Sequence, residues 1–342
     1  MAVSTILALS NDAASRAWDE FVLAQPRAHL LQLSSWGLLK AQFGWEAQIV
    51  TLTDETGIHA GALVLLRRLP LMAGKMAYVP MGGYVSDPAN YALLWKAIRR
   101  ETGAAFLKLE PGHFPVGEAP DLASMGFQQS PQTIQPATTI IIDIDADDDR
   151  ILRRMNQGTR RKIRKSLTGG ITYKEGDRAD LPAFSRLMRQ TSARNAFGVH
   201  SAAYFEAVFD LLVIEYGALM LAKHEDELLA AIMIFAVGDT AWYLYGASTR
   251  AQSNLYATYG IQWEAIQWAK GRGCRHYDLW GVPDHDKGKL EAEFKHRSDG
   301  LWGVYGFKRG WGGEVKHSMG AWDLAWNPIV YTAYRAALKL KR

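Results

Sequence analysis

The sequence is poor in the features that build disulfides, cysteine-based metal sites and membrane spans. Its one cysteine, Cys274, excludes an internal disulfide and a cysteine metal cluster, and it fits a reducing compartment. No window holds 18 uninterrupted apolar residues, so we expect no helix that spans a membrane. Residues 1–5 lack the basic start of a signal peptide, and Asn11 and Asp12 interrupt the apolar run. We therefore expect a cytoplasmic protein, and peripheral contact with a membrane surface stays open.

Familiar catalytic motifs are also missing. There is no P-loop, no Gly-x-Gly-x-x-Gly dinucleotide motif, no serine elbow and no histidine pair with metal spacing. His276 and Asp278 lie on one expected strand, which gives too few ligands for a metal site. Asp284-His285-Asp286 is more typical of a solvated turn. We therefore expect no metal ion.

The composition is that of an ordinary globular protein. The chain has 342 residues, 48% of them hydrophobic and 22% charged, and this length favours two domains. The net charge of +4 permits an anionic partner without requiring one.

Periodicity predicts alternating helices and strands, which indicates an α/β or α+β layer fold with mixed sheets flanked by helices. We expect helices at residues 13–24, 34–42, 91–101, 120–125, 150–167, 181–192, 202–212, 257–270 and 329–340. We expect strands at residues 47–53, 60–67, 76–85, 104–110, 138–144, 217–223, 228–237, 241–247 and 275–280. The acidic run 145–149 is the expected boundary. The first domain would hold residues 1–145 plus 314–342, with the last helix packed back on it, and the second residues 146–313.

A short internal match indicates a duplicated domain. Trp95-Lys96-Ala97-Ile98 and Trp263-Glu264-Ala265-Ile266 each lie in an expected helix, followed by a glycine turn and a strand that ends in an acid. The acids are Glu110 and Asp278. Two short matches can arise by chance, but their shared helix–turn–strand context favours duplication.

The most informative stretch is the run from Tyr305 to Gly313. It holds four glycines, three aromatic residues and the adjacent cations Lys308 and Arg309. Glycine lets a backbone approach a ligand closely, aromatic rings stack on flat groups, and cations bind phosphate or stabilise an oxyanion. The alternative is a glycine-rich turn with core aromatic residues. We interpret the run as an anion-binding loop with Lys308 as its main residue.

A second signal is the run 153–165, which holds seven cations and no acid. On one helix these cations would cover the solvent face, with Leu152 and Leu167 among the inward residues. Such a face attracts phosphate groups, although a solvated helix face explains it equally well.

Three smaller groups are ambiguous when each is taken alone. Trp36 and Lys40 lie four residues apart on one expected helix, and so do His200 and Tyr204 if a helix starts there. Tyr243 and Tyr245 would share one face of an expected strand. Taken alone, the first and last groups are better explained by a core tryptophan beside an extended lysine and by a half-buried aromatic strand.

Taken in order, these pieces resemble the Fem family (FemABX) of non-ribosomal peptidyltransferases, which build peptidoglycan cross-bridges. The segments that carry the resemblance span most of the chain. They are Gln32…Trp36…Lys40, Met155…Thr159-Arg160…Ile163-Arg164-Lys165, Tyr204-Phe205, Tyr243-Leu244-Tyr245-Gly246-Ala247-Ser248, Asn254…Tyr259…Gln262-Trp263…Ala269…Gly273, Tyr277-Asp278-Leu279-Trp280-Gly281 and Gly306-Phe307-Lys308-Arg309-Gly310.

The resemblance implies two tandem acetyltransferase-like (GNAT) domains, here without the coiled-coil arm of some members. It implies transfer of an amino acid from aminoacyl-tRNA to an amine of a UDP-linked or lipid-linked muropeptide, by a monomer that needs no cofactor. Lys308 would stabilise the oxyanion or hold the terminal tRNA phosphate, with Phe307 beside it.

Lys40 would hold a precursor phosphate, aided by Tyr204 and Tyr245, with Trp36, His200 and Tyr243 as further substrate-binding residues. The tRNA contacts rest on charge alone, at Arg160, Arg161, Arg164 and Lys165.

The chain departs from the family pattern at two places. His200 stands where relatives often have an arginine, and Glu110 ends a Lys108-Leu109-Glu110-Pro111 segment where relatives often have Arg-x-Asp-Pro. Glu110 could act as a base, but a structural role is favoured.

Two other functions remain open. The first is a GNAT-like N-acyltransferase with an acyl-CoA donor or a non-peptidoglycan acceptor. The glycine-free turn 250–255 argues against CoA, since CoA enzymes of this fold cradle pyrophosphate on a glycine-rich turn, and it leaves a different acceptor open. The second is a non-catalytic RNA-binding protein that uses the basic helix.

Overall fold

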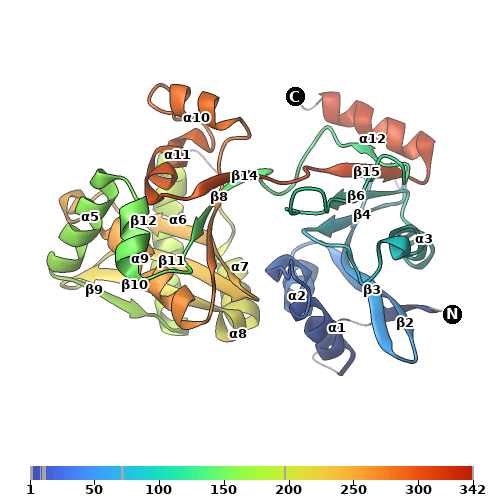
Figure 1. Ribbon diagram of the computed structural model, residues 1–342, viewed down its shortest axis with the longest axis horizontal. Coiled ribbons are helices and arrows are strands. Elements are labelled where there is room, and N and C mark those ends of the chain that lie inside the picture. Colours follow the sequence, from blue (N-terminus) through green and yellow to red (C-terminus); the bar gives the residue numbers. More distant parts are fainter. Residues whose placement is uncertain (1–2, 8, 10–12, 71–72, 196–197, 341–342) are drawn as a thin grey trace. The chain divides into compact units, whose positions relative to one another are not determined.

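The computed structural model describes the chain except residues 1–2, 8, 10–12, 71–72, 196–197 and 341–342. It divides into two compact units, residues 1–137 with 317–342 and residues 138–316 (Figure 1). The expected boundary was the run 145–149, but unit 2 begins at Thr138. Strand β8 (Thr138–Asp143) therefore belongs to unit 2 and not to the first domain as expected. The last helix, α12 (Pro328–Leu340), belongs to unit 1.

Unit 1 is a mixed sheet with strands in the order β1-β2-β3-β4-β6-β15-β7, and β5 pairs with β3. Its strands are β1 (Val3–Leu7), β2 (Glu46–Asp54), β3 (Gly57–Arg68), β4 (Lys75–Pro80), β5 (Tyr84–Val85), β6 (Phe106–Glu110), β7 (Gln128–Gln129) and β15 (Trp322–Ala325). Its helices are α1 (Ala13–Leu23), α2 (Ser34–Ala41), α3 (Tyr91–Thr102) and α12. Helix α3 buries Leu94, Trp95 and Ile98 at helical spacing against the sheet.

Unit 2 is a mixed sheet with strands in the order β14-β8-β13-β12-β11-β10-β9. The strands after β8 are β9 (Ile171–Glu175), β10 (Gly217–His224), β11 (Glu227–Val237), β12 (Thr240–Ser248), β13 (His276–Gly281) and β14 (Glu314–His317). The helices are α4 (Asp148–Arg154), α5 (Gln157–Thr168), α6 (Leu181–Asn195), α7 (Ala202–Val208), α8 (Ile214–Tyr216), α9 (Ala257–Gly271), α10 (Lys287–Glu293) and α11 (Trp302–Lys308).

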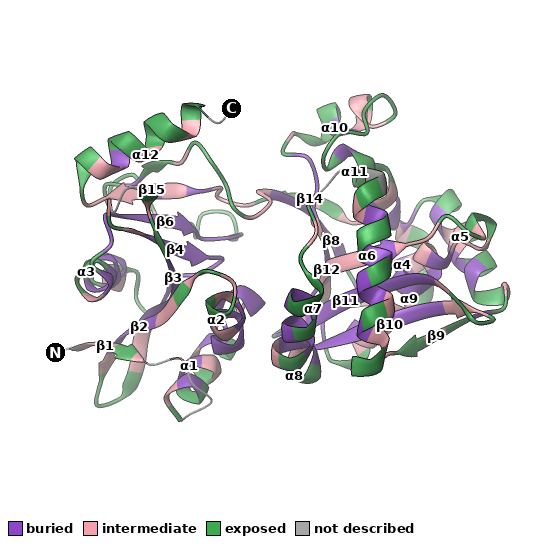
Figure 2. Cartoon of the chain, turned by 180° about the vertical axis from the view of Figure 1, so that it is seen from behind, coloured by how far each residue is buried: buried purple, intermediate pink, exposed green. Residues whose placement is uncertain are grey.

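The two sheets repeat one pattern, as the internal match predicted. In each, a run of antiparallel strands is followed by a crossover helix, α3 or α9, and by a parallel strand, β6 or β13. An antiparallel strand from the other end of the unit's chain then lies beside it, β15 in unit 1 and β8 in unit 2. Strands β6, β8 and β13 are largely buried, and β15 is mostly of intermediate burial, as its colour in Figure 2 shows. Glu110 and Asp278 therefore occupy matching strands.

Several expected elements are different in the structure. The expected strand 76–85 is two strands, β4 and β5, and residues 120–125 form turns rather than a helix. The expected helix 202–212 is α7 followed by a π-helical turn, Phe209–Val213. Among the described residues, no helix has both the length and the apolar character that a bilayer crossing needs.

The basic run 153–165 does not form one helix. Met155 and Asn156 are extended, so α4 ends at Arg154 and α5 starts at Gln157. The Asn156 side chain accepts a hydrogen bond from Thr159 N at 2.7 Å and caps α5. Because the chain turns here, Leu167 is 41% exposed and not inward as expected.

Candidate active site

The glycine-rich run from Tyr305 to Gly313 is helical, which corrects the expectation of a loop. Helix α11 buries Trp302, Tyr305 and Lys308, which lie three residues apart on one side. A 3-10 turn, Arg309–Trp311, continues it, and Gly312 with φ of +76° ends it. Lys308 is therefore held by a packed element of fixed geometry.

The glycines of this run face the protein itself. A Cβ atom on Gly310 would lie 2.4 Å from Thr159 Oγ1, and one on Gly312 would lie 2.3 Å from the Arg154 carbonyl oxygen. Asn156 N also donates to the Gly310 carbonyl at 3.0 Å. These glycines let the turn pack against the junction of α4 and α5, so close approach to a ligand is not what requires them.

The ammonium group of Lys308 lies at the carboxyl end of β13. Its Nζ donates to the carbonyl oxygens of Gly281 at 2.7 Å and Trp280 at 3.2 Å. Consecutive carbonyls of a regular strand point in opposite directions, but Trp280 has a left-handed backbone with φ of +62°. This conformation lets both carbonyls accept from one cation. Burial lowers the pKa of Lys308 to about 8 against the opposing effect of Asp278.

Asp278 is the buried acid of this site. It accepts hydrogen bonds from Thr139 Oγ1 and, at 2.7 Å, from Trp280 N. Burial raises the pKa of Asp278 to about 6, while these two donors and the charge of Lys308 act in the opposite direction. A buried acid and a buried base with pKa values displaced toward each other mark a candidate catalytic site.

The neighbours of Lys308 fix the end of α11. Phe307 is half-buried, and its ring centroid lies 5.0 Å from that of Tyr259 and 5.8 Å from that of Trp311. Arg309 binds both carboxylate oxygens of Glu291 through Nε, at 2.8 and 3.0 Å. Arg309 and Trp311 thus stabilise the segment that carries Lys308.

Strands β12 and β13 pair in parallel only over three residues each, up to Trp242 and Asp278. Beyond this point β12 continues against β11 alone, and β13 pairs with β8 through Gly281. The two central strands therefore separate where Asp278, Trp280 and the Lys308 ammonium gather.

Tyr243 and Tyr245 lie on opposite faces of the sheet, which corrects the prediction of one face. A β-bulge at Leu244 sets Tyr243 opposite Ile234 and Tyr245 opposite Met233. Because Met233 and Ile234 are consecutive, their side chains point to opposite faces, and so do those of the two tyrosines. Tyr243 packs on the core that contains α9 and Trp311, and burial raises its pKa to about 12.

Tyr245 forms a separate cluster with Tyr204 and His200. The two phenol oxygens lie 3.2 Å apart, and the His200 ring stacks on Tyr204 with centroids 3.8 Å apart. His200 is exposed while Tyr204 is only 3% exposed. The structure therefore brings together Tyr204, Tyr245 and His200 as the sequence predicted, and separates Tyr243 from them.

The predicted tRNA-binding cations lie on α5. Arg161, Arg164 and Lys165 are exposed, and Arg160 is partly buried with Nη1 donating to the Met155 carbonyl at 2.6 Å. Within the described part of the chain, none of these four cations forms a salt bridge. Their charge is therefore not neutralised by neighbouring acids.

Unit 1 holds Trp36 and Lys40 on α2, as predicted. Lys40 Nζ lies 5.4 Å from the Trp36 ring centroid, and burial lowers the pKa of Lys40. Trp36 is 6% exposed, and its Nε1–H has no hydrogen-bond acceptor among the described residues.

Glu110 is fully engaged in unit 1. Its carboxylate accepts from Tyr78 Oη at 2.5 Å, Ile134 N at 2.5 Å and Gln135 N at 3.0 Å. Burial raises its pKa despite these donors. Lys108, two residues earlier, forms a buried pair with Asp323 at 3.0 Å. These contacts give the strand-end acid a structural role.

The fold places the chain in a class of proteins with two tandem GNAT-like units, as the sequence analysis predicted. The crystal structure of FemX aligns with a TM-score of 0.82 and 23% identity, over 96% of this chain and 99% of that one. A tandem GNAT protein of the clavulanic acid biosynthesis pathway aligns with a TM-score of 0.54 and 12% identity, over 95% and 98% of the two chains.

Within this class, the chain belongs to the FemAB family, whose model matches residues 124–224 and 214–339. Similar curated proteins are the lipid II:glycine glycyltransferases of Staphylococcus aureus strains MRSA252 and USA300. Each is 25% identical to this chain, and the alignment covers 92% of both proteins. The predicted Fem resemblance is confirmed.

Sequence reasoning missed the partners of Lys308. Asp278 was considered as a metal ligand and as the strand-end acid of the internal repeat, but not as a partner of Lys308, and Thr139 and the Trp280 carbonyl were not considered as partners. The equivalence of Asp278 with Glu110 in the internal repeat was the signal that could have identified this acid.

Proposed function

We propose that the protein transfers an amino acid from aminoacyl-tRNA to an amine of a peptidoglycan precursor's stem peptide. The observation that carries this proposal is Lys308, a buried cation held by two carbonyls beside Asp278. Family membership and the names of the glycyltransferase relatives support the reaction class.

The chemistry needs a stabilised oxyanion. The acceptor amine attacks the ester carbonyl carbon and forms a C–N bond, the C–O bond to the tRNA ribose breaks, and the proton that the amine loses passes to the leaving ribose oxygen. An ammonium has three N–H donors, and Lys308 uses two on the Gly281 and Trp280 carbonyls. Its third donor finds no acceptor among the described residues and can meet the oxyanion. The ester is already activated, so the proposal includes no covalent enzyme intermediate.

Each unit, taken by itself, offers groups suited to an acceptor. Lys40 of unit 1, whose Nζ lies 5.4 Å from the Trp36 ring centroid, offers a cation to phosphate oxygens of a UDP-linked or lipid-linked precursor. Tyr204, Tyr245 and His200 of unit 2 offer hydroxyl groups and an exposed ring. Tyr243 lies on the opposite face of the sheet and packs on the same core as Phe307. We propose that it contacts the substrate from that face.

We propose that the donor substrate, aminoacyl-tRNA, binds to the face of α5 whose cations form no salt bridge within the described chain. Arg160, Arg161, Arg164 and Lys165 supply charge for tRNA phosphates, so donor binding should weaken with salt. We infer that the protein works in the cytoplasm as a monomer, where charged tRNA and precursor are both present.

We predict that the activity falls above about pH 8, as Lys308 loses its proton. The Asp278 charge opposes the lowering of the Lys308 pKa, so Asp278→Asn should move this descending limb to lower pH. The measurement is the pH profile of kcat/KM for wild type and variant, taken from initial rates. If kcat/KM declined at the same pH in wild type and Asp278→Asn, the decline would not reflect the titration of Lys308, and the proposed role of Lys308 would be contradicted.

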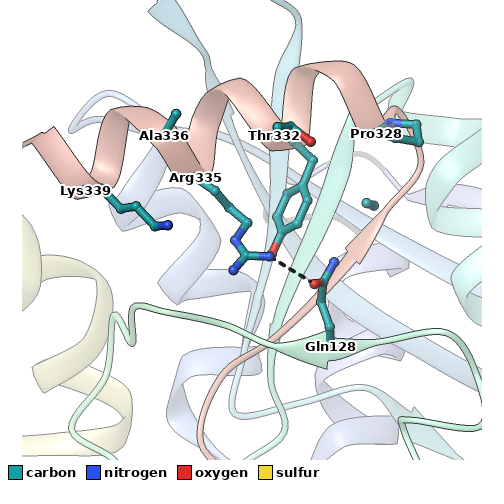
Figure 3. Close-up of a pocket in the computed structure, with 8 residues that line it drawn as sticks. Gln128, Pro328, Thr332, Arg335, Ala336 and Lys339 are labelled. Carbon is teal, nitrogen blue, oxygen red and sulfur yellow. Dashed lines mark hydrogen bonds between the residues drawn. The ribbon is translucent and has the colours of Figure 1, made fainter.

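A lipid-linked acceptor requires contact with a membrane surface, and we propose that α12 makes it. Ile329 and Leu340 on this helix are 83% and 89% exposed. Arg335 and Lys339 line a hollow of about 460 Å³ beside the helix, and Arg335 Nη1 donates to Gln128 at 3.2 Å (Figure 3). Exposed apolar residues next to cations fit an anionic lipid surface.

The double variant Ile329→Gln, Leu340→Gln should therefore bind less to vesicles that contain phosphatidylglycerol, measured by flotation. Leu93→Gln, at a 49% exposed position of α3, is the matched control and should bind like wild type. Equal binding of the double variant and wild type would exclude α12 as the contact.

A transfer assay tests the proposed function. Charged tRNAs are offered with a UDP-linked pentapeptide, or with the lipid-linked precursor in vesicles, and the mass gain of the peptide is measured. The acyl-CoA alternative predicts transfer from acyl-CoA instead, and a purely RNA-binding protein predicts no mass gain with any donor.

A further inference from the structure

A group of aromatic rings and lysines, here called the α5–α9 platform, lies where helices α5 and α9 pack together. It consists of Lys162 and Lys165 from α5, and Tyr256 and Tyr259 at the start of α9. Lys162 Nζ donates to Tyr259 Oη at 3.0 Å and lies 4.6 Å from that ring's centroid. The Tyr256 ring has Lys162 Nζ at 5.6 Å and Lys165 Nζ at 5.5 Å.

The platform carries charge that the protein does not neutralise. Helix α5 has five cations and no acid in its twelve residues, and none of the five forms a salt bridge within the described chain. Some cations elsewhere in unit 2 are paired, for example Lys270 with Asp148 and Arg309 with Glu291. The exposed side of α5 (Figure 2) therefore offers several donors to phosphate groups.

The backbone holds Tyr256 in an unusual conformation. Its φ of +56° lies in the left-handed region, which a bulky aromatic residue rarely adopts. Gln252, four residues earlier in the same turn, is also left-handed, with φ of +48°. Strained residues of this kind gather at binding sites, where the position of the side chain matters more than local stability. Both tyrosines are only partly buried, so their rings are accessible.

The platform is continuous with the segment that carries Lys308. The Tyr259 ring stacks on Trp311, with centroids 6.0 Å apart and planes at 15°. It also meets the edge of Phe307, the residue immediately before Lys308, with centroids 5.0 Å apart. A row of aromatic rings thus leads from the cations of α5 to α11.

We propose that the α5–α9 platform binds the unpaired 3′ end of an RNA, with a base stacked on Tyr256 and phosphates on Lys162, Lys165 and Arg161. Binding of single strands combines cations along the backbone with aromatic rings that stack on exposed bases. Inside a duplex the base faces are covered by neighbouring base pairs, so stacking on Tyr256 favours the single strand. The proposal rests on the proposed function, in which the donor ester lies at the unpaired end of a tRNA.

The test uses fluorescence anisotropy with two probes, a short single-stranded RNA with the tRNA 3′-terminal sequence and an RNA duplex of equal length. Tyr256→Asn removes the ring, and asparagine tolerates the left-handed backbone. We expect this variant to bind the single strand about 10-fold more weakly and the duplex unchanged. Tyr256→Phe should bind like wild type. Unchanged single-strand binding by Tyr256→Asn, or an equal loss for both probes, would overturn the proposal.

A charge variant tests the phosphate contacts separately. Lys165→Gln, at an exposed position, should reduce the slope of log K against log salt by about 0.7 for the single strand. Lys96→Gln, an exposed lysine of α3, removes the same charge and should leave the slope unchanged. Equal slopes for Lys165→Gln and wild type would contradict the assignment.

The platform and the proposed function can fail independently. RNA binding through Tyr256 without any amino acid transfer would keep the platform and reject the transferase. Transfer from charged tRNA with RNA binding that ignores Tyr256 would keep the transferase and reject the platform.

Discussion

Replacing Lys308 by alanine should lower kcat by about 100- to 1,000-fold, because the loss of one oxyanion donor costs about 2.7–4 kcal/mol. Binding of charged tRNA should change little, because the substitution leaves the cations of α5 in place. The measurement is single-turnover transfer at saturating substrates, alongside the Kd for charged tRNA. A variant that transfers at the wild-type rate would contradict the role of Lys308.

The same substitution has a structural cost that must be separated from the catalytic one. Without the ammonium, the Trp280 and Gly281 carbonyls lose their donor and Asp278 loses its cation. An unsatisfied buried polar group costs about 1–3 kcal/mol of unfolding free energy. Thermal unfolding of Lys308→Ala therefore accompanies the kinetics. Lys289→Ala, the same change at an exposed position of α10, is the control and should leave both rate and stability unchanged.

Replacing Gly312 by alanine should destabilise unit 2 by about 3 kcal/mol or more. The left-handed backbone of Gly312 costs any other residue about 1–2 kcal/mol. The added Cβ would also lie 2.3 Å from the Arg154 carbonyl oxygen and 2.9 Å from Met155 N, both backbone atoms that cannot turn aside. The turn would have to leave the α4–α5 junction, which displaces Lys308 and lowers turnover.

Calorimetry measures this effect as a fall in Tm of about 6–12 °C. The matched control is Gly271→Ala at the end of α9, where an added Cβ meets no atom within 4 Å. This control should change the stability by less than about 0.5 kcal/mol. Equal melting of the Gly312→Ala variant and wild type would show that the turn tolerates a side chain.

The periodic parts of the fold could be predicted from the sequence because burial enforces their pattern. Helix α3 and strand β3 follow the expected ranges closely, since each buries one face or a continuous apolar run. The glycine-rich run was misinterpreted because its glycines serve contacts with Thr159 and Arg154, far away in the sequence. A single sequence does not contain that information.

The site was predicted in part for the same reason. Lys308 stood out because a cation beside glycines and aromatic residues is unusual, and the structure holds it near Asp278. Tyr243 and Tyr245 were placed on one face because a strand has a period of two. The extra residue Leu244 places the two tyrosines on opposite faces, and the local sequence contains no pattern that predicts the bulge.

Transfer of a labelled amino acid tests the central claim most directly. Wild type and Lys308→Ala are each given the UDP-linked pentapeptide with tRNA that carries a radiolabelled amino acid, and in parallel with labelled acyl-CoA. The account predicts label on the pentapeptide from the tRNA only, at a rate that Lys308→Ala lowers by at least 100-fold. Label from acyl-CoA and none from any charged tRNA would contradict it.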